Sequence, residues 1–242
     1  LEVIPKPGLD QNEANALINK VRLLSGVSVI TRLRSSGHVR RTLPESVAAQ
    51  SRDYRHLVAI ACSTGGPQAM SWLLPRLEQG FAAPVLISQH ISDGFVDGMV
   101  QWLNTLSSLP VKVAEQDDPL RAGQVYVSPS EHHMVVTPDN RIDLQPRLPG
   151  DLYRPCCDRL LESVASTHGA DSIALIMTGM GRDGAAGMLT VHNSGGHTLA
   201  QDEASSVIFG MNQEAIALGA IKHILPLEEI PAHLNQLVAG SP

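Results

Sequence analysis

HLVAIACSTGGPQAM, residues 56–70, joins an aliphatic run to a polar turn and then to a segment that suits a helix. The run LVAIA has no polar side chain, and an unbroken aliphatic run is typical of a strand buried on both faces of a parallel sheet. Gly65 and Gly66 favour a turn, and Pro67 suits the first turn of a helix. The stretch therefore predicts a strand over residues 56–62 and a helix over residues 67–77.

The same alternation of aliphatic runs and amphipathic segments continues toward the C-terminus. Further strands are predicted at 83–89, 111–116, 171–179, 197–201 and 223–227, and further helices at 95–106, 156–168, 184–193, 213–218 and 227–237. Short runs lie between 123 and 144, and the turn residues TPDNR between the last two predict a hairpin. Strands separated by helices form a mostly parallel sheet covered on both faces. We therefore predict a doubly wound α/β fold with a small antiparallel hairpin excursion.

Residues 1–50 differ in composition from the rest of the chain. The spacing of Leu17, Ile18, Val21 and Leu24 predicts a helix over residues 12–24. The stretch TRLRSSGHVRRTLPESVAAQSRD that follows is polar, basic and rich in turn residues, which is typical of a linker. We therefore expect residues 51–242 to form the main domain.

Composition excludes several classes of protein. The 242 residues have a net charge of −6 and no long basic run, which argues against a nucleic-acid-binding face. No run of 18 apolar residues is present, so no membrane insertion is expected. Cys62, Cys156 and Cys157 lack a C-x-x-C spacing, so no metal site is predicted and a reducing cytoplasm is the expected location. His132 and His133 are interpreted as surface or packing residues.

Polar clusters follow three of the predicted strands. They are CSTGG after the first, SQH after the second and TGMGRDG after the strand near residue 175. Because the carboxyl ends of parallel strands share one edge of a sheet, Ser63, His90 and Asp183 are candidates for a nucleophile, a base and an orienting carboxylate. Each also has a structural interpretation: Ser63 as a cap or turn residue, His90 as a structural histidine, and Asp183 as a cap of the helix beginning at Gly184.

Four motifs carry a family resemblance. ACSTGGPQAM, ISQHISDGF, IMTGMGRDGAAGM and AQDEASSVIFGM resemble the motifs of the CheB-type protein-glutamate methylesterases of chemosensory pathways, in order and spacing, over about residues 56–238. The resemblance implies the fold predicted above. It also implies Ser63 as nucleophile, His90 as base and Asp183 as the orienting carboxylate.

The resemblance also implies the edge of the site. Thr64 and Met180 match family positions there, with the Met180 backbone N–H as the oxyanion donor. The turn at Gly65 and Gly66 lets the backbone approach a substrate closely. The loop YRPCCD, residues 153–158, matches a family loop over the site.

The chain departs from the family pattern at several of these positions. Ser92-Asp93 replaces a proline-containing pair, Tyr153 a histidine, Cys156 a serine and Asn212 a proline. None of these departures removes Ser63, His90 or Asp183, so they bear on the choice of substrate more than on activity.

The resemblance implies that the chain hydrolyses glutamyl methyl esters on cytoplasmic chemoreceptor helices without a metal or organic cofactor. Some members of the family also deamidate receptor glutamines. A receiver domain and a histidine kinase of the pathway are the implied partners. VIPKPG, residues 3–8, resembles the end of a receiver, and residues 1–50 are too few for a domain of about 100 residues.

Two alternatives remain open from the sequence. One is a catalytically silent adaptor that binds receptor tails, against which the intact Ser63, His90 and Asp183 argue. The other is a nucleotide-binding module at the glycine-rich TGMGRDGAAG, which lacks the G-x-G-x-x-G pattern.

Overall fold

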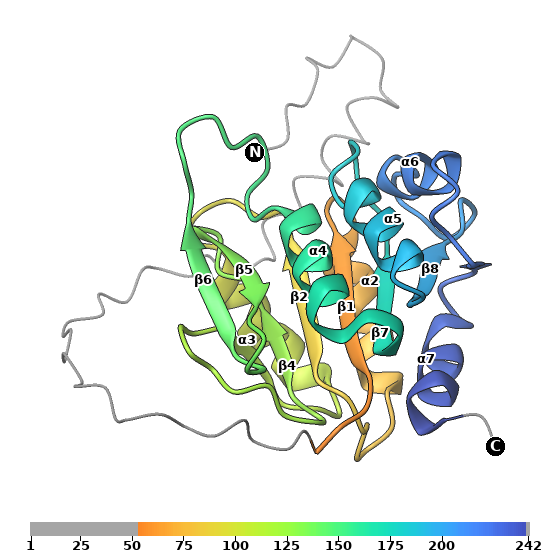
Figure 1. Ribbon diagram of the computed structural model, residues 1–242, viewed down its shortest axis with the longest axis horizontal. Helices are drawn as coiled ribbons and strands as arrows, with labels where there is room; N and C mark the ends of the chain where they lie inside the picture. The colour runs from red at the N-terminus through yellow and green to blue at the C-terminus, as the bar shows by residue number, and fades with distance from the viewer. Residues whose placement is uncertain (1–52, 241–242) are drawn as a thin grey trace, which may run out of the picture. The chain divides into compact units, whose positions relative to one another are not determined.

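The computed structural model describes residues 53–240, and the helix predicted over residues 12–24 lies outside them. Its centre is a seven-stranded sheet with the order β3-β4-β2-β1-β7-β8-β9, in which every neighbouring pair is parallel (Figure 1). The strands are β1 (Leu57–Cys62), β2 (Val85–Gln89), β3 (Val111–Val113), β4 (Val125–Val127), β7 (Ser172–Ile176), β8 (His197–Gln201) and β9 (His223–Leu225).

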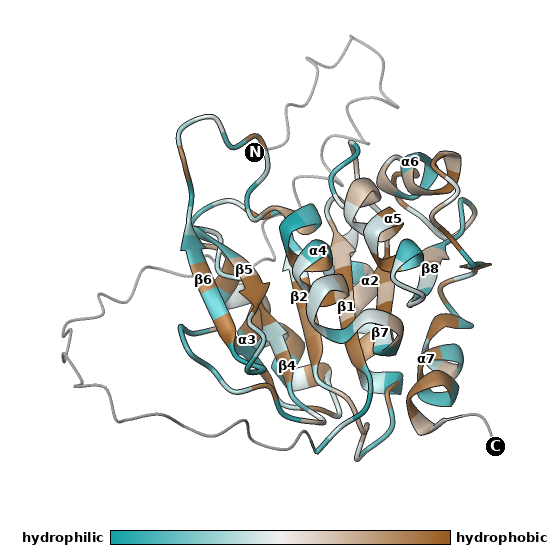
Figure 2. Cartoon of the chain, in the orientation of Figure 1, coloured by the Kyte–Doolittle hydropathy of each residue, from teal (hydrophilic) through white to brown (hydrophobic). Residues whose placement is uncertain are grey.

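Helices cover both faces of this sheet. One core includes α2 (Gly66–Leu73), α3 (Val96–Leu106) and α7 (Ile230–Ala239), and the other includes α4 (Cys157–His168), α5 (Ala185–Asn193) and α6 (Met211–Ala217). Successive strand residues point to opposite faces, so Val58 and Ile60 of β1 pack into the first core while Ala59 and Ala61 pack into the second. Figure 2 shows these strands as a hydrophobic centre. The predicted doubly wound fold is confirmed.

The predicted antiparallel hairpin is also confirmed. β5 (His132–Val136) and β6 (Ile142–Pro146) pair in antiparallel fashion and form a separate two-stranded sheet. Met134 and Ile142 are buried in the core that includes α4. The hairpin therefore belongs to the α4 side of the molecule.

The helix predicted over residues 67–77 is shorter than expected. α2 ends at Leu73, and a 3-10 turn over Leu74–Arg76 follows. Pro75 lies inside this turn and has no backbone N–H to continue the α-helical hydrogen bonds. The proline therefore accounts for the early end of the helix.

The order of strands reverses between β1 and β7. From β1 the chain adds strands toward β3, and from β7 it adds strands toward β9 on the other side. Ligands of open α/β sheets bind at such a switch point, beside the carboxyl ends of the strands. Within residues 53–240, no helix combines the length and apolar character that crossing a bilayer would need.

Candidate active site

Ser63 directly follows β1 at the switch point. Its backbone N–H donates to the carbonyl of Thr178 at 3.0 Å, and its carbonyl accepts the N–H of Gly66 at 2.9 Å, which closes the turn into α2. Gly179 packs directly against it: a Cβ atom there would lie 2.8 Å from the Ser63 Cβ and would also collide with the Met211 thioether. Ser63 is therefore held, partly exposed, between the ends of β1 and β7.

His90 directly follows β2, and a buried amide links it to Ser63. Its backbone N–H donates to the carbonyl of Cys62 at 3.1 Å. The Gln89 amide Nε2, in a side chain only 3% exposed, donates to the carbonyls of Ser63 at 2.9 Å and His90 at 2.7 Å. A side chain at Gly66 would collide with this amide. Gln89 lies in the SQH cluster, but its bridging role was not predicted from the sequence.

Asp183 is 1% exposed and receives hydrogen bonds on both carboxylate oxygens. Oδ2 accepts from His90 Nε2 at 2.6 Å and from the backbone N–H of Cys157 at 2.7 Å, and Oδ1 accepts from the N–H of Asp158 at 3.1 Å. Burial acts to raise the pKa of Asp183, but the hydrogen bonds from His90 and these two N–H groups outweigh it and lower that pKa. The ionised carboxylate holds the proton of His90 on Nε2, which leaves Nδ1 as an acceptor.

The interpretation of Asp183 as a cap of the helix that follows it is wrong. α5 has Gly184 at its N-cap and no side-chain cap. The carboxylate instead accepts from the first two residues of α4, whose amino end carries unpaired N–H groups and a positive partial charge. Sequence spacing holds no signal for this contact, because it depends on how α4 packs against β7.

The two residues expected at the edge of the site, Thr64 and Met180, have backbone N–H groups that are free to bind. Among the described residues, the N–H groups of Thr64 and Met180 make no hydrogen bond. Thr64 is exposed, and Met180 is 70% exposed. Gly65 has the left-handed φ of 84° that the turn requires, and Val207 lies directly over it. The two N–H groups thus lie beside Ser63 on the chain and on the neighbouring turn.

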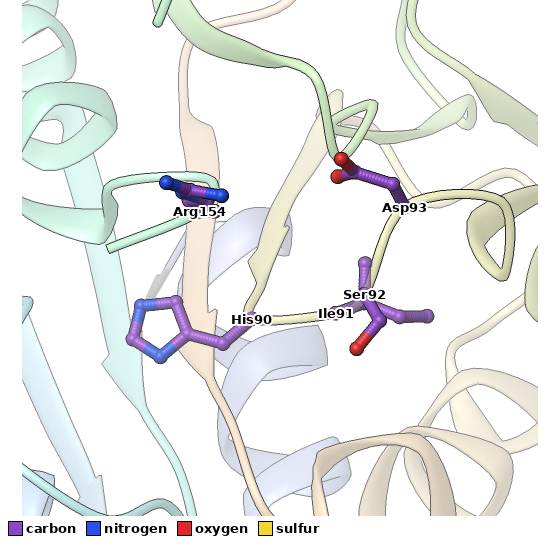
Figure 3. Close-up of a pocket in the computed structure, with 5 residues that line it drawn as sticks. All are labelled: His90, Ile91, Ser92, Asp93 and Arg154. Carbon is purple, nitrogen blue, oxygen red and sulfur yellow. The ribbon is translucent and has the colours of Figure 1, made fainter. Parts of the chain in front are cut away.

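A cavity of about 510 Å³ opens beside the imidazole. His90, Ile91, Ser92, Asp93 and Arg154 line it. Figure 3 shows Arg154 and Asp93 on separate loops above the strand end that carries His90.

The predicted loop over the site lies against His90. The ring of Tyr153 stacks on the imidazole, with 5.3 Å between centroids and 11° between planes. The guanidinium of Arg147, just before this loop, forms a two-pronged ion pair with Asp93 at 3.2 and 3.1 Å. Two of the residues that depart from the family pattern, Tyr153 and Asp93, therefore lie around the cavity.

Three cysteines lie close to the site, and the pKa of each thiol is raised, so the thiols are protonated. Burial is the main cause that raises the pKa of Cys62 and Cys157 and brings that of Cys156 to about 12, with the charge of Asp183 adding to the last two. The donor atoms of His90, Cys157 and Asp183 lie within 4.8 Å of one another. A cation there would have to displace the proton that His90 donates to Asp183.

Ser63 and His90 follow the paired strands β1 and β2 at one edge of the sheet, where Asp183 bonds to His90. Among the described residues, no hydrogen bond joins the Ser63 hydroxyl to His90. Such hydrogen bonds often tighten only when a substrate is bound. Among the described residues, Nδ1 of His90 has no hydrogen-bond partner and is available to accept a proton.

Comparison with known proteins gives a consistent result. Residues 58–234 match the model of the protein family described as CheB methylesterase. The chain is 43% identical to "protein-glutamate methylesterase/protein-glutamine glutaminase 3" of Paramagnetospirillum magneticum, over 100% of this chain and 70% of that protein. It is 47% identical to "protein-glutamate methylesterase FrzG" of Myxococcus xanthus, over 75% of this chain and 54% of that protein. A crystal structure of the Thermotoga maritima CheB methylesterase catalytic domain matches with a TM-score of 0.73 and 34% identity, over 76% of this chain and 98% of that one.

Proposed function

The chain belongs to the CheB methylesterase family, and on that premise we propose that it hydrolyses glutamyl methyl esters on cytoplasmic chemoreceptor helices with Ser63, His90 and Asp183 as its catalytic groups. The observation that carries the proposal is the 2.6 Å hydrogen bond from His90 to the buried Asp183, which leaves the second ring nitrogen without a partner among the described residues. The names of several relatives include protein-glutamine glutaminase, and we extend the proposal to deamidation of receptor glutamines.

In the first half of the reaction, the Ser63 oxygen attacks the ester carbonyl while His90 Nδ1 accepts the hydroxyl proton. The resulting imidazolium is stabilised by the carboxylate of Asp183. His90 then gives the proton to the departing methoxide, which leaves as methanol. In the second half, water gives a proton to His90 and attacks the acyl-Ser63 ester, which releases the glutamate carboxylate and restores the serine hydroxyl.

The oxyanion of each tetrahedral intermediate needs donors that are in place before the reaction. The backbone N–H groups of Thr64 and Met180 are suitable, since neither is used by another described residue. The left-handed turn at Gly65 keeps the backbone close to Ser63, and the amino end of α2 adds a positive partial charge. We therefore assign oxyanion binding to Thr64 and Met180.

The surroundings of Ser63 suit a helical protein substrate. Exposed apolar side chains lie on two loops beside it: Met180, 70% exposed, follows Gly179, and Val207, 61% exposed, lies over Gly65. Exposed apolar residues grouped at a site are typical of a surface that binds another protein. An amphipathic receptor helix offers apolar side chains next to its methylated glutamates.

Methanol release from a methylated receptor fragment tests the function. Ser63→Ala should fold normally and lose turnover by a factor on the order of 10⁶. A variant that keeps turnover within about tenfold of the wild type would contradict Ser63 as the nucleophile. Ammonia release from fragments with glutamine at the same positions tests the second activity.

We also propose that residues 1–50 are the end of a receiver domain and its linker. The chain starting near Ser51 should then be soluble and hydrolyse the ester at least as fast. If residues 12–24 instead complete the core, the shortened chain should aggregate or melt at a much lower temperature. Comparing melting midpoints and methanol release of both lengths decides between these outcomes.

A further inference from the structure

The charges around the site differ from the charge of the whole chain. The chain has a net charge of −6, yet two carboxylates beside the site are paired with arginines. Arg147 pairs with Asp93, and Arg159 pairs with Asp151. These two ion pairs reduce the acidic charge that would repel an anionic substrate.

Two arginines in loops around the site have no ion-pair partner among the described residues. Arg154 and Arg182 are exposed, and among the described residues neither guanidinium forms an ion pair or hydrogen bond. Arg154 lines the cavity with His90 (Figure 3), and Arg182 immediately precedes Asp183. Arg154 follows β6 and Arg182 follows β7, and these two loops are neighbours, because a Cβ atom at Gly181 would lie 3.6 Å from the Tyr153 hydroxyl. The two arginines are called the arginine pair below.

The backbone of each arginine is anchored, so its position next to the catalytic groups is fixed. The carbonyl of Arg154 accepts the N–H of Ile91 at 3.3 Å, and the carbonyl of Arg182 accepts the N–H of Ala185 at 3.1 Å. The adjacent Tyr153 is stacked on His90. Each arginine thus presents an exposed cation from an anchored backbone at the edge of the site.

We propose that the arginine pair is a subsite for carboxylates that flank the scissile ester, so that the enzyme selects acidic helical segments. The proposal rests on the proposed function, which supplies the ester. Guanidinium groups bind carboxylates through two parallel hydrogen bonds, which suits glutamate or aspartate side chains one turn from the ester. Free cations beside a site, on a chain that is acidic overall, also direct an acidic segment toward that site.

Two peptides of equal length test the proposal. Both carry one glutamyl methyl ester on a receptor-like helix, and one has glutamates at the neighbouring positions where the other has glutamines. Methanol release gives kcat and KM for each peptide. The wild type should favour the acidic peptide, mainly through a lower KM, and the preference should shrink at high salt.

Arg154→Gln and Arg182→Gln should each raise KM for the acidic peptide by roughly threefold, and together by about tenfold, as expected for exposed ion pairs. The neutral peptide should be hydrolysed almost unchanged. Arg121→Gln is the matched control, because Arg121 is exposed and precedes β4 at the amino ends of the strands. It makes the same change in net charge and should leave both KM values as they are.

Equal wild-type kcat/KM for the two peptides would overturn the subsite, and so would variants that slow both peptides alike. Hydrolysis of neither peptide by the wild type would instead overturn the proposed function. Binding of both peptides to Ser63→Ala, measured by fluorescence anisotropy, still tests the arginine pair in that case. Equal affinity for the two peptides there would also count against it.

Discussion

Within residues 53–240, two histidine–aspartate pairs have nearly the same hydrogen bond and different surroundings. His90 Nε2 lies 2.6 Å from Asp183, and His133 Nε2 lies 2.8 Å from Asp151. In the first pair the histidine side chain is 15% exposed and the carboxylate 0%. In the second the histidine is 0% exposed and the carboxylate 19%. The histidine is partly exposed in the pair whose carboxylate is buried, and it is buried in the pair whose carboxylate is partly exposed.

The second ring nitrogen separates the pairs further. Nδ1 of His133 accepts the backbone N–H of Cys156 at 3.0 Å, so both nitrogens of this buried ring are occupied. Nδ1 of His90 has no such partner among the described residues. A histidine with both nitrogens bonded holds structure together, whereas one with a free nitrogen and an ionised partner can move a proton. Distance alone does not identify a catalytic pair.

The largest effect is expected from matched changes of the two histidines. His90→Gln should lower methanol release by a factor on the order of 10⁶, because no other group can accept the Ser63 proton. His133→Gln should lower the melting midpoint while turnover stays within about tenfold of the wild type, since it acts only through packing and hydrogen bonds. Both variants are measured for methanol release and thermal unfolding. A comparable loss of turnover in the two would end the distinction between the pairs.

Changes of the two aspartates should also affect turnover differently, but the difference should be smaller than for the two histidines. Asp183→Asn should cost on the order of 10⁴ in turnover, because an amide favours the wrong tautomer of the histidine. The asparagine also places an N–H₂ group among donors from His90, Cys157 and Asp158, so some stability is lost as well. Asp151→Asn should leave turnover almost unchanged. Stability and methanol release measured on one preparation separate the two roles, and near-normal turnover by Asp183→Asn would exclude an orienting carboxylate.

The sequence was informative where the physical signal is local. Aliphatic runs and turn residues predicted the parallel sheet and the hairpin, since burial on both faces of a strand leaves a continuous apolar run. The polar clusters after strands predicted that Ser63, His90 and Asp183 would lie at one edge. Helix ends were less exact, as the early end of α2 before Pro75 shows.

Contacts between distant elements could not be predicted in this way. Nothing local indicates that Asp183 meets the first turn of α4 or that Gln89 bridges two carbonyls. The adjacent His132 and His133 looked equivalent, yet only His133 is fully buried. Strand alternation requires the two to point to opposite faces, but the packing of the hairpin on α4 decides which face is buried.

A third comparison concerns how the carboxylates of Asp183 and Asp151 affect the stability of the protein in acid. The pKa of Asp183 is lowered by the hydrogen bonds that outweigh its burial, and that of Asp151 is lowered by the Leu148 N–H and then by His133. A carboxyl whose pKa is lower in the folded state adds stability above the unfolded value of about 3.9, and this is lost as pH falls through the folded value. Asp183→Asn and Asp151→Asn should each therefore show a smaller drop in melting midpoint between pH 7 and pH 3 than the wild type.

Salt distinguishes these two contributions. Asp151 is reachable by solvent, so its contribution should shrink at high ionic strength, while that of the sealed Asp183 should persist. Thermal unfolding at low and high salt, at both pH values, provides the measurement. Equal salt sensitivity of the two variants would contradict the difference in burial that separates the pairs.

The smallest effect is expected at Cys156, the residue that touches both pairs. Its backbone N–H donates to His133, and its thiol donates to Asp183 Oδ1 at 3.3 Å. Cys156→Ser keeps a donor in the same place, so turnover should stay within about twofold of the wild type. Cys156→Ala removes a weak S–H donor at a cost below about 1 kcal/mol, because Asp183 keeps its bonds from His90 and from the backbone of α4.

Turnover by Cys156→Ala should accordingly remain within about fivefold of the wild type, since a cost of about 1 kcal/mol changes a rate by roughly that factor. The double variant Cys156→Ala with His133→Gln then tests whether the pairs are independent. If they are, the two losses of stability add to within about 0.5 kcal/mol. A loss of turnover near 10², or strong coupling in the double variant, would mean that the His133 pair holds Asp183 in place through Cys156. The His133–Asp151 pair would then be part of the catalytic arrangement, and His133 would be a positioning residue for the His90–Asp183 pair.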